Sequence, residues 1–345
     1  MILIVGTGFS VFGDVITQGE YLNGYLLEQG VNARLVSRYP KYVKRTLDTL
    51  YNLFQLRKND MIIIQVYGSK SIWLEWLSAN IGKFKKVRVI STLHGGAIPD
   101  MHRKSFVKRF LLRDIFRKSD LVTAPSLFMV KELNLKFLEE KFTVIPNFIE
   151  INEYSAKEHY DHAFNLFWMR AYQKMYDPIK ALEVVRLLLK KGKKVKLHMA
   201  GPDQGLYPKV SDYVKKHKLS NEVTLYGKID TPEKNRLAKI CSLFLNTSRI
   251  DNCPVTFLEM MALGLPIVTT NVGGIPYWVD DKNAAISQDN SAEDIARRID
   301  VLLSDKNSYH KMVDHNLEYV RNFSRENIGQ QWLQVIAKLN GSALN

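Results

Sequence analysis

The hydrophobic pattern of the first 150 residues alternates between short apolar runs and longer amphipathic stretches. The segments between the runs show helical periodicity, beginning at about residues 15–30, and the runs are "MILIVG", "NARLVS", "MIIIQVYG", "VRVISTLHGG", "LVTAPS" and "FTVIPNF". Strands that are apolar on both faces and alternate with helices are typical of a parallel sheet covered on both sides. The pattern predicts a doubly wound α/β domain over residues 1–150.

A second series of the same kind begins at residue 164. Its predicted strands are "FNLFWMR", "VKLHMAGP", "VTLYGKI", "SLFLNTS" and "PIVTTN". Helical periodicity covers residues 177–192 and 206–218, and Pro232 and Pro254 stand where the first turn of two further helices is expected. We therefore predict a second Rossmann-like domain over residues 151–325, with the polar residues 146–160 as the linker.

Three more helical patterns follow from residue 291 to the end of the sequence. The last, residues 326–345, carries Ile328, Trp332 and Ile336 on one face. This face must pack somewhere, but the periodicity does not indicate the surface on which it packs.

Length and composition fit a two-domain globular protein in a reducing compartment. The chain has 345 residues, and its two cysteines, Cys241 and Cys253, match no metal-binding spacing or disulfide framework. No apolar run approaches the roughly 20 residues of a membrane-spanning helix. The first residues lack the basic start of a signal peptide. We expect a cytoplasmic protein.

The formal net charge is +14 and is unevenly placed. Residues 1–150 hold 22 Lys and Arg against 13 Asp and Glu, an excess of nine, and the remainder has an excess of five. A positive excess attracts nucleic acid, acidic lipid or phosphorylated metabolites, and it also serves solubility alone. A nucleic-acid binder would rest on this charge alone, so we predict no nucleic-acid partner.

Residues 103–118, "RKSFVKRFLLRDIFRK", gather seven cations with five apolar residues at roughly helical spacing: Phe106, Val107, Phe110, Leu111 and Ile115. Such a helix suits an anionic membrane surface that carries a lipid-linked acceptor. It equally suits packing on the domain's own sheet, which is the usual role of a Rossmann helix. Peripheral contact with the inner face of the membrane is therefore a hypothesis.

The loop after the first strand, "GTGFSVFGDV", contains Gly6, Gly8 and Gly13. These glycines resemble a dinucleotide fingerprint with the wrong last spacing, and Arg38 after the second strand would suit the 2′-phosphate of NADP. Two interpretations of this loop remain at this point: the cofactor site of an NADP-dependent oxidoreductase, or a tight strand-to-helix turn without a ligand.

Two further groups follow strands at the edge where α/β sheets bind ligands. His94 ends a strand and precedes two glycines that allow another molecule to approach the backbone. Arg170 ends the first strand of the second domain, and Lys174 follows it. A guanidinium fork and a mobile ammonium suit a diphosphate, although a basic surface would also contain such residues.

The stretch "SRIDNCPVTFLEMMALGLPIV" places Asp251 before a predicted helix and Glu259 within its first two turns. The start of that helix offers free N–H groups and a positive dipole end to an anion or to sugar hydroxyls. Both carboxylates are suitable acceptors for hydroxyl donors. The alternative is that Asp251 caps the helix and Glu259 forms an ordinary salt bridge.

The spacing of Asp251 and Glu259, followed by "MMALGLPIVTTNVGGIP", resembles the E-x7-E signature of retaining glycosyltransferases of family 4, with Asp in place of the first Glu. "TLHGG", "IPNFI", the Arg170 and Lys174 pair, "MAGPDQG" and "LYGKI" follow the family's order and spacing. The resemblance covers nearly the whole chain.

The resemblance implies the GT-B architecture, in which two tandem Rossmann-like domains face a cleft and the last helix crosses back to the first domain. It implies a nucleoside diphosphate sugar as donor. By similarity, Glu259 binds the ribose hydroxyls, Asp251 the transferred sugar, and Arg170 with Lys174 the diphosphate.

The remaining roles follow from the same resemblance. Backbone groups near Val255 and Thr256 assist with phosphate, and Lys228 and Ile229 border the base. Gly13, Asp14 and His94 lie on the acceptor side, where His94 orients the sugar or acceptor.

The implied function is metal-independent, retaining transfer to a saccharide or lipid-linked acceptor in cell-surface polysaccharide biosynthesis, without a cofactor. No Asp-x-Asp pair, which would bridge a divalent metal to the phosphates, occurs in the sequence. A sugar-nucleotide epimerase or a phosphorylase of the same fold is the alternative.

Overall fold

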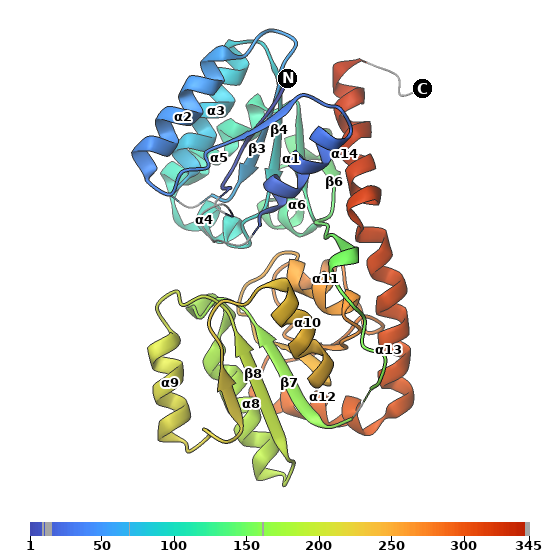
Figure 1. Ribbon diagram of the computed structural model, residues 1–345. Coiled ribbons are helices and arrows are strands. Elements are labelled where there is room, and N and C mark those ends of the chain that lie inside the picture. Colours follow the sequence, from blue (N-terminus) through green and yellow to red (C-terminus); the bar gives the residue numbers. More distant parts are fainter. Residues whose placement is uncertain (9, 11–15, 69, 161, 342–345) are drawn as a thin grey trace. The chain divides into compact units, whose positions relative to one another are not determined.

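The computed structural model describes residues 1–8, 10, 16–68, 70–160 and 162–341 (Figure 1). The chain divides into two compact units. Unit 1 comprises Met1–Phe148 together with the segment that begins at Arg325, and unit 2 comprises Ile149–Ser324. Each unit has its own parallel sheet and its own hydrophobic core.

The sheet of unit 1 has the strand order β2-β1-β3-β4-β5-β6 among the described residues, and every pairing is parallel. Its strands are β1 (Ile2–Val5), β2 (Ala33–Val36), β3 (Met61–Val66), β4 (Arg88–Leu93), β5 (Leu121–Ala124) and β6 (Phe142–Val144). Its helices are α1 (Gln18–Glu28), α2 (Tyr42–Gln55), α3 (Ile72–Phe84), α4 (Ile98–Lys104), α5 (Phe106–Lys118), α6 (Phe128–Leu133), α7 (Lys136–Glu139) and α14 (Arg325–Asn340).

Alternating side chains of the first strand enter two different cores, as the all-apolar pattern predicts. Leu3 and Val5 pack with the layer that contains α2, α3 and α5. These helices lie along one side of the sheet in Figure 1. Ile2 and Ile4 pack on the opposite face with α1 and with Trp332 of α14. The apolar face of the last helix therefore covers the sheet of unit 1.

The sheet of unit 2 has the order β12-β11-β10-β7-β8-β9 among the described residues, again all parallel. Its strands are β7 (Phe164–Met169), β8 (Val195–Ala200), β9 (Val223–Leu225), β10 (Leu243–Asn246), β11 (Ile267–Thr269) and β12 (Ala284–Ile286). Its α-helices are α8 (Pro178–Lys190), α9 (Tyr207–Lys216), α10 (Thr231–Ile240), α11 (Val255–Ala262), α12 (Ala292–Ser304) and α13 (Lys306–Tyr319). Its 3₁₀ helices are η2 (Ile151–Glu153), η3 (Lys174–Tyr176), η4 (Ile275–Tyr277) and η5 (Val320–Phe323).

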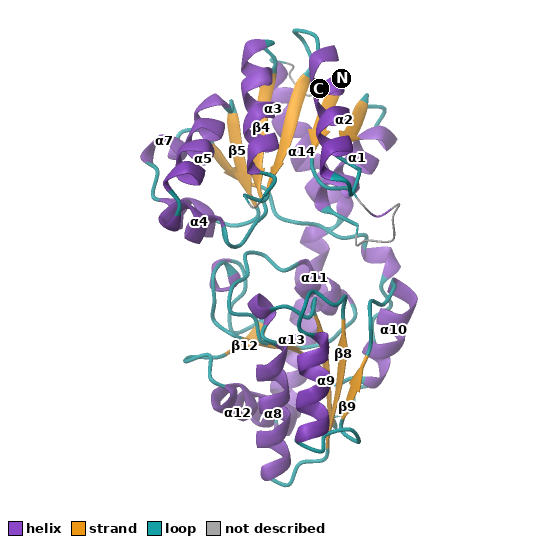
Figure 2. Ribbon diagram, turned by 90° about the vertical axis from the view of Figure 1, so that its left-hand side faces the viewer, coloured by secondary structure: helices purple, strands orange, loops and turns teal. Residues whose placement is uncertain are grey.

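Helices cover both faces of this second sheet as well. Leu166 and Trp168 of β7 point into the core that contains α8, α9 and α12. Phe167 and Met169 point into the opposite core with α11. Figure 2 shows α8 and α9 on one side of β8 and β9, and α10 on the other. The two predicted doubly wound sheets are confirmed.

The predicted bounds of two helices need correction. The basic stretch 103–118 is not one helix, because α4 ends at Lys104 and Ser105 begins α5, where its hydroxyl accepts a hydrogen bond from the Lys108 N–H. Ser105 breaks the helical run because its side chain satisfies a backbone donor that would otherwise have no acceptor. Pro254 is the N-cap of α11 and lies just before its first turn.

Among the residues that the structure describes, no helix combines the length and the apolar character needed to cross a bilayer.

Candidate functional site

The site of unit 2 lies at the switch point of its sheet, the place where the strand order reverses. Strands β7 and β10 are neighbours, and the chain continues from them toward opposite edges, so the loops after them diverge and leave room for a ligand. Arg170 directly follows β7, and Asp251 lies in the loop after β10. Nη2 of Arg170 donates to Oδ2 of Asp251 at 2.9 Å, and both side chains are largely buried.

The arginine of this pair retains unused hydrogen-bonding capacity. Its guanidinium lies over the ring of Tyr176 at 5.1 Å, and its Nε is buried without an acceptor in the described part of the chain. Burial, followed by the charge of Asp251, raises the pKa of Tyr176, so this phenol stays neutral. A buried guanidinium donor without an acceptor carries a free-energy cost that an anionic ligand would remove.

Two glycines of the predicted motifs allow the loops of this pair to lie where they do. Gly201 has φ +148°, and a Cβ there would lie 1.9 Å from the carbonyl oxygen of Arg170. Gly273 has φ +55°, and a Cβ there would lie 2.0 Å from the carbonyl oxygen of Asp251. The glycines of "MAGP" and "NVGG" are therefore required by the close backbone approach that positions these two residues.

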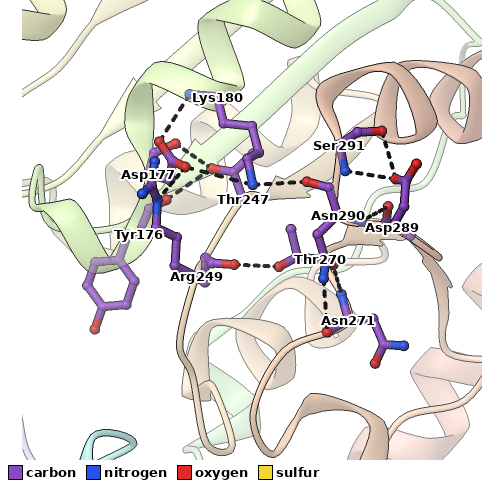
Figure 3. A network of polar contacts seen from close by, with 12 residues as sticks. Tyr176, Asp177, Lys180, Thr247, Arg249, Thr270, Asn271, Asp289, Asn290 and Ser291 are labelled. Atoms are coloured by element: carbon purple, nitrogen blue, oxygen red, sulfur yellow. Dashed lines mark hydrogen bonds and ion pairs between the residues drawn. The ribbon is translucent and has the colours of Figure 1, made fainter.

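A polar network fixes the same loops to one another (Figure 3). The Thr247 hydroxyl donates to the carbonyl oxygens of Tyr176 and Asp177 at 3.0 Å each. Asp177 accepts from Nε of Arg249 at 2.7 Å. Thr270 donates to the Ser248 carbonyl at 2.7 Å. These bonds join the loops that follow β7, β10 and β11, so the site rests on a cross-linked scaffold.

Glu259 has partners that the sequence did not identify. Its Oε1 accepts from Nζ of Lys234 at 2.6 Å and from the Tyr154 hydroxyl at 3.0 Å. Lys234 comes from α10 and also lies over the Tyr154 ring at 5.4 Å. The salt bridge that was the alternative interpretation of Glu259 is therefore present in the structure. No sequence signal links these residues, since they lie on three elements separated in the chain.

The start of α11 offers donors beside Asp251. Val255 and Thr256 occupy its first turn, where backbone N–H groups have no acceptor within the helix. The Thr256 hydroxyl is buried and has no hydrogen-bond partner among the described residues. These groups suit a phosphate or hydroxyl-bearing ligand.

Three other residues that were predicted to bind the sugar donor are Lys174, Lys228 and Ile229. Lys174 is exposed in η3 and forms no ion pair with an acid in the described ranges. Lys228 is exposed and Ile229 is half-buried, in the loop between β9 and α10. No hydrogen bond or ion pair joins Lys174 or Ile229 to Arg170 or Asp251 within the described residues.

In unit 1, His94 follows β4 and is held by its surroundings. Its backbone N–H donates to the Val66 carbonyl at 3.0 Å, and its ring stacks on that of Tyr67 with centroids 5.6 Å apart. A Cβ at Gly95 would lie 2.4 Å from the Tyr67 carbonyl oxygen, which explains the glycine after the histidine. Burial lowers the pKa of His94 to about 4, so the imidazole is neutral near pH 7.

Sequence reasoning missed a buried acid that binds the backbone of Tyr67, the ring partner of His94. Glu75 of α3 accepts from the Tyr67 N–H at 3.1 Å and from the Ser71 hydroxyl at 2.6 Å, and burial raises its pKa to about 6. Its role is to hold the loop after β3, which carries Tyr67. Only the folded chain shows this, because a Glu in a helical sequence usually indicates an exposed position.

The remaining predictions on unit 1 concern its glycine loop. Gly13 and Asp14 lie outside the described residues. A Cβ at Gly6 would lie 2.6 Å from the Gln65 side chain, and one at Gly8 would lie 2.5 Å from Leu35. Packing therefore accounts for both of these glycines. Within the described ranges, no group of three or more His, Cys, Asp or Glu side chains is arranged to hold a metal ion.

Comparison with known families covers most of the chain. The model of the family described as "Glycosyl transferases group 1" matches residues 152–318, and that described as "Glycosyltransferase Family 4" matches residues 18–153. The boundary between the two matches falls close to the boundary between unit 1 and unit 2.

A curated relative and two solved structures are similar over long stretches. N-acetyl-alpha-D-glucosaminyl L-malate synthase of Bacillus anthracis is 23% identical, over 90% of this chain and 83% of that protein. The structure of Anabaena HepE with UDP and glucose is 15% identical with a TM-score of 0.75, over 97% of this chain and 99% of that one. S. aureus TarM, in a complex with Fondaparinux, alpha-GlcNAc-glycerol and UDP, is 19% identical with a TM-score of 0.68. That match covers 85% of this chain and spans 59% of the TarM chain.

Proposed function

Because the chain belongs to the group 1, family 4 glycosyltransferases with the GT-B fold, we propose that it transfers a sugar from a nucleoside diphosphate sugar to a glycan acceptor. The acceptor is a saccharide or a lipid-linked saccharide, in cell-surface polysaccharide biosynthesis. UDP in the HepE structure, and UDP with alpha-GlcNAc-glycerol in that of TarM, support this choice of donor and acceptor class.

The observation that carries the proposal is the Arg170–Asp251 pair at the switch point of the unit 2 sheet. Departure of a nucleoside diphosphate from the anomeric carbon creates negative charge on its β-phosphate. Arg170, Lys174 and the first N–H groups of α11, at Val255 and Thr256, stabilise that charge. Asp251 accepts hydrogen bonds from the transferred sugar.

The nucleoside is bound by the neighbouring loops. Glu259 accepts from the ribose hydroxyls through the oxygen that Lys234 and Tyr154 do not occupy. Lys228 and Ile229 border the base.

The reaction retains the configuration of the anomeric carbon. The acceptor hydroxyl attacks from the face that the leaving group vacates, and its proton passes to an oxygen of the departing phosphate. The new bond joins acceptor oxygen to anomeric carbon, while the bond from that carbon to phosphate oxygen breaks. His94, neutral at pH 7, orients the sugar or acceptor by hydrogen bonding and does not donate a proton. Gly13 and Asp14 belong to the acceptor side.

Protein groups supply the positive charge, and the proposal assigns no step to a metal ion. Transfer in the presence of EDTA tests this. Undiminished turnover is expected, and abolition that added Mg²⁺ or Mn²⁺ reverses would refute metal independence.

Residues 103–118 are proposed to contact the membrane that holds a lipid-linked acceptor. In α5, Leu111 and Ile115 are buried against the sheet, whereas Phe106, Val107 and Phe110 are exposed. Replacement of Lys104, Lys108, Arg109 and Arg113 by Glu should reduce binding to anionic liposomes. Unchanged binding would remove this part of the proposal.

The donor is identified by thermal-shift screening with UDP, GDP, ADP, CMP and dTDP sugars. A ligand that binds only the folded state raises the midpoint of unfolding. The screen is followed by transfer assays in which product linkage is read by NMR. An epimerase or a phosphorylase of the same fold would instead convert the donor without a glycan acceptor. If no nucleotide sugar shifts the midpoint, the proposal fails.

A further inference from the structure

Helix α2 presents an apolar face to solvent. Val43, Leu47, Tyr51 and Phe54 recur every three or four residues, so they lie on one face of the helix. Each of these side chains is between 58% and 70% exposed. An exposed apolar stripe that runs the length of a helix is typical of an interaction surface, whereas isolated exposed apolar residues are ordinary.

The inner face of the same helix is unusually polar. Thr49 and Asn52 are buried there beside Leu53. Asn52 accepts from Nη1 of Arg34 at 2.9 Å and donates to the Asp48 carbonyl at 2.8 Å. These bonds hold Asn52 on the inner face of α2, so the apolar residues of the opposite face remain turned outward.

The neighbouring helix α3 also exposes apolar side chains. It exposes Trp73 near its start and Phe84 at its end. Lys85, which follows Phe84, donates to the Phe54 carbonyl at 2.5 Å, so the ends of α2 and α3 lie side by side.

Cations flank the stripe at both ends. Lys41 and Lys44 are exposed at the start of α2, and Arg57 and Lys58 are exposed just beyond its end. Residues 38–58 contain six Lys and Arg and a single acid, Asp48. An apolar stripe between cationic ends is complementary to a bilayer surface, where acyl chains take up the apolar residues and anionic headgroups attract the cations.

We propose that the exposed face of α2, formed by Val43, Leu47, Tyr51 and Phe54 with the flanking lysines and arginines, docks on an anionic lipid surface. The face differs from the α5 residues assigned above and does not depend on the transfer reaction. It would add four inserted apolar side chains to the contact proposed for residues 103–118.

The test is co-sedimentation of the full chain with vesicles of phosphatidylcholine containing phosphatidylglycerol, and with vesicles of phosphatidylcholine alone. We expect binding to the anionic vesicles that weakens with added salt. Leu47→Ser combined with Phe54→Ser should lower this binding by about tenfold or more, since two partly inserted apolar side chains are lost. Val301→Ser is the matched control, because Val301 is equally exposed on α12 of unit 2.

Unfolding midpoints show whether each variant is folded, and Lys44→Glu with Lys58→Glu gives a second variant in which the apolar residues are intact. Absence of binding by the wild type, or full binding by the Leu47/Phe54 variant, would overturn the proposal. A self-associated chain that the Leu47/Phe54 variant converts to monomers, with no vesicle binding, would assign the face to a second copy. None of these measurements requires a sugar donor, so failure here is separate from failure of the proposed transferase function.

Discussion

Nη2 of Arg170 and Oδ2 of Asp251 lie 2.9 Å apart and join the loops that follow two neighbouring strands, β7 and β10. Without ligand, each charge neutralises the other. In the proposed function, a diphosphate that binds Arg170 would compete with Asp251, and Asp251 would become available to sugar hydroxyls when the arginine turns to the phosphates. The pair would thus couple the two halves of the proposed nucleotide sugar.

Arg170→Ala should weaken donor binding by about 10- to 100-fold, because charge-assisted hydrogen bonds to phosphate are lost. The measurement is the donor-induced rise in unfolding midpoint, titrated with the nucleotide sugar that the screen identifies. Arg298→Ala is the control, since Arg298 forms a similarly buried pair with Asp294 on α12. An undiminished donor response in Arg170→Ala would contradict the site.

Glu259→Ala should remove the donor response, whereas Lys234→Ala should raise the KM for donor by about tenfold and leave kcat nearly unchanged. This is the effect expected of a positioning residue, because Lys234 binds Glu259 and holds its carboxylate in one orientation. Tyr154→Phe removes the other bond to the same oxygen and should have a smaller effect in the same direction. Lys239→Ala, at the exposed end of α10, is the matched control. If Lys234→Ala instead lowered kcat and left KM unchanged, the positioning role of Lys234 would be contradicted.

Gly273→Ala should destabilise the protein by about 3 kcal/mol, since it adds a Cβ 2.0 Å from the Asp251 carbonyl at φ +55°. Gly205→Ala separates the two causes, because φ is +99° there but no atom lies within 4 Å of the added Cβ. It should cost about 1 kcal/mol from backbone strain alone. Free energies of unfolding from urea titrations compare the variants. Equal losses at both positions would show that the contact with Asp251 is unimportant.

The buried neutral state of His94 should make stability fall in acid. Its pKa is lowered from the ordinary 6.5 to about 4, so between these values the unfolded chain binds a proton that the folded chain excludes. The contribution of this group is therefore complete above pH 6.5 and is lost as the pH falls toward 4, by about 3 kcal/mol. His94→Asn should lack this component. The difference in free energy of unfolding between the two proteins, followed from pH 7 to pH 4, isolates it, and a constant difference would show that His94 titrates normally.

Much of the candidate site was predictable because α/β sheets place ligands at the carboxyl ends of their strands. Arg170, Asp251 and His94 could be assigned to strand ends from local apolar runs alone. The glycines after the strands at residues 200 and 269 could be located in the same way, although their reason, contact with the Arg170 and Asp251 carbonyls, required the fold. Lys234, Tyr154 and Glu75 could not be found, because each acts through a partner on another element.

The sequence by itself determined the two parallel sheets. Strands buried on both faces must be apolar throughout, and such runs can be recognised in the sequence without knowing which strands are neighbours. The resemblance implied that the last helix returns to the first domain, but only the tertiary structure decided that its apolar face covers the sheet of unit 1, that Glu259 pairs with Lys234, and that α2 turns its apolar residues outward. These outcomes depend on which surfaces meet across large separations in the chain. Periodicity reports the faces of one element, whereas the free energy of burial depends on the partner that covers each face.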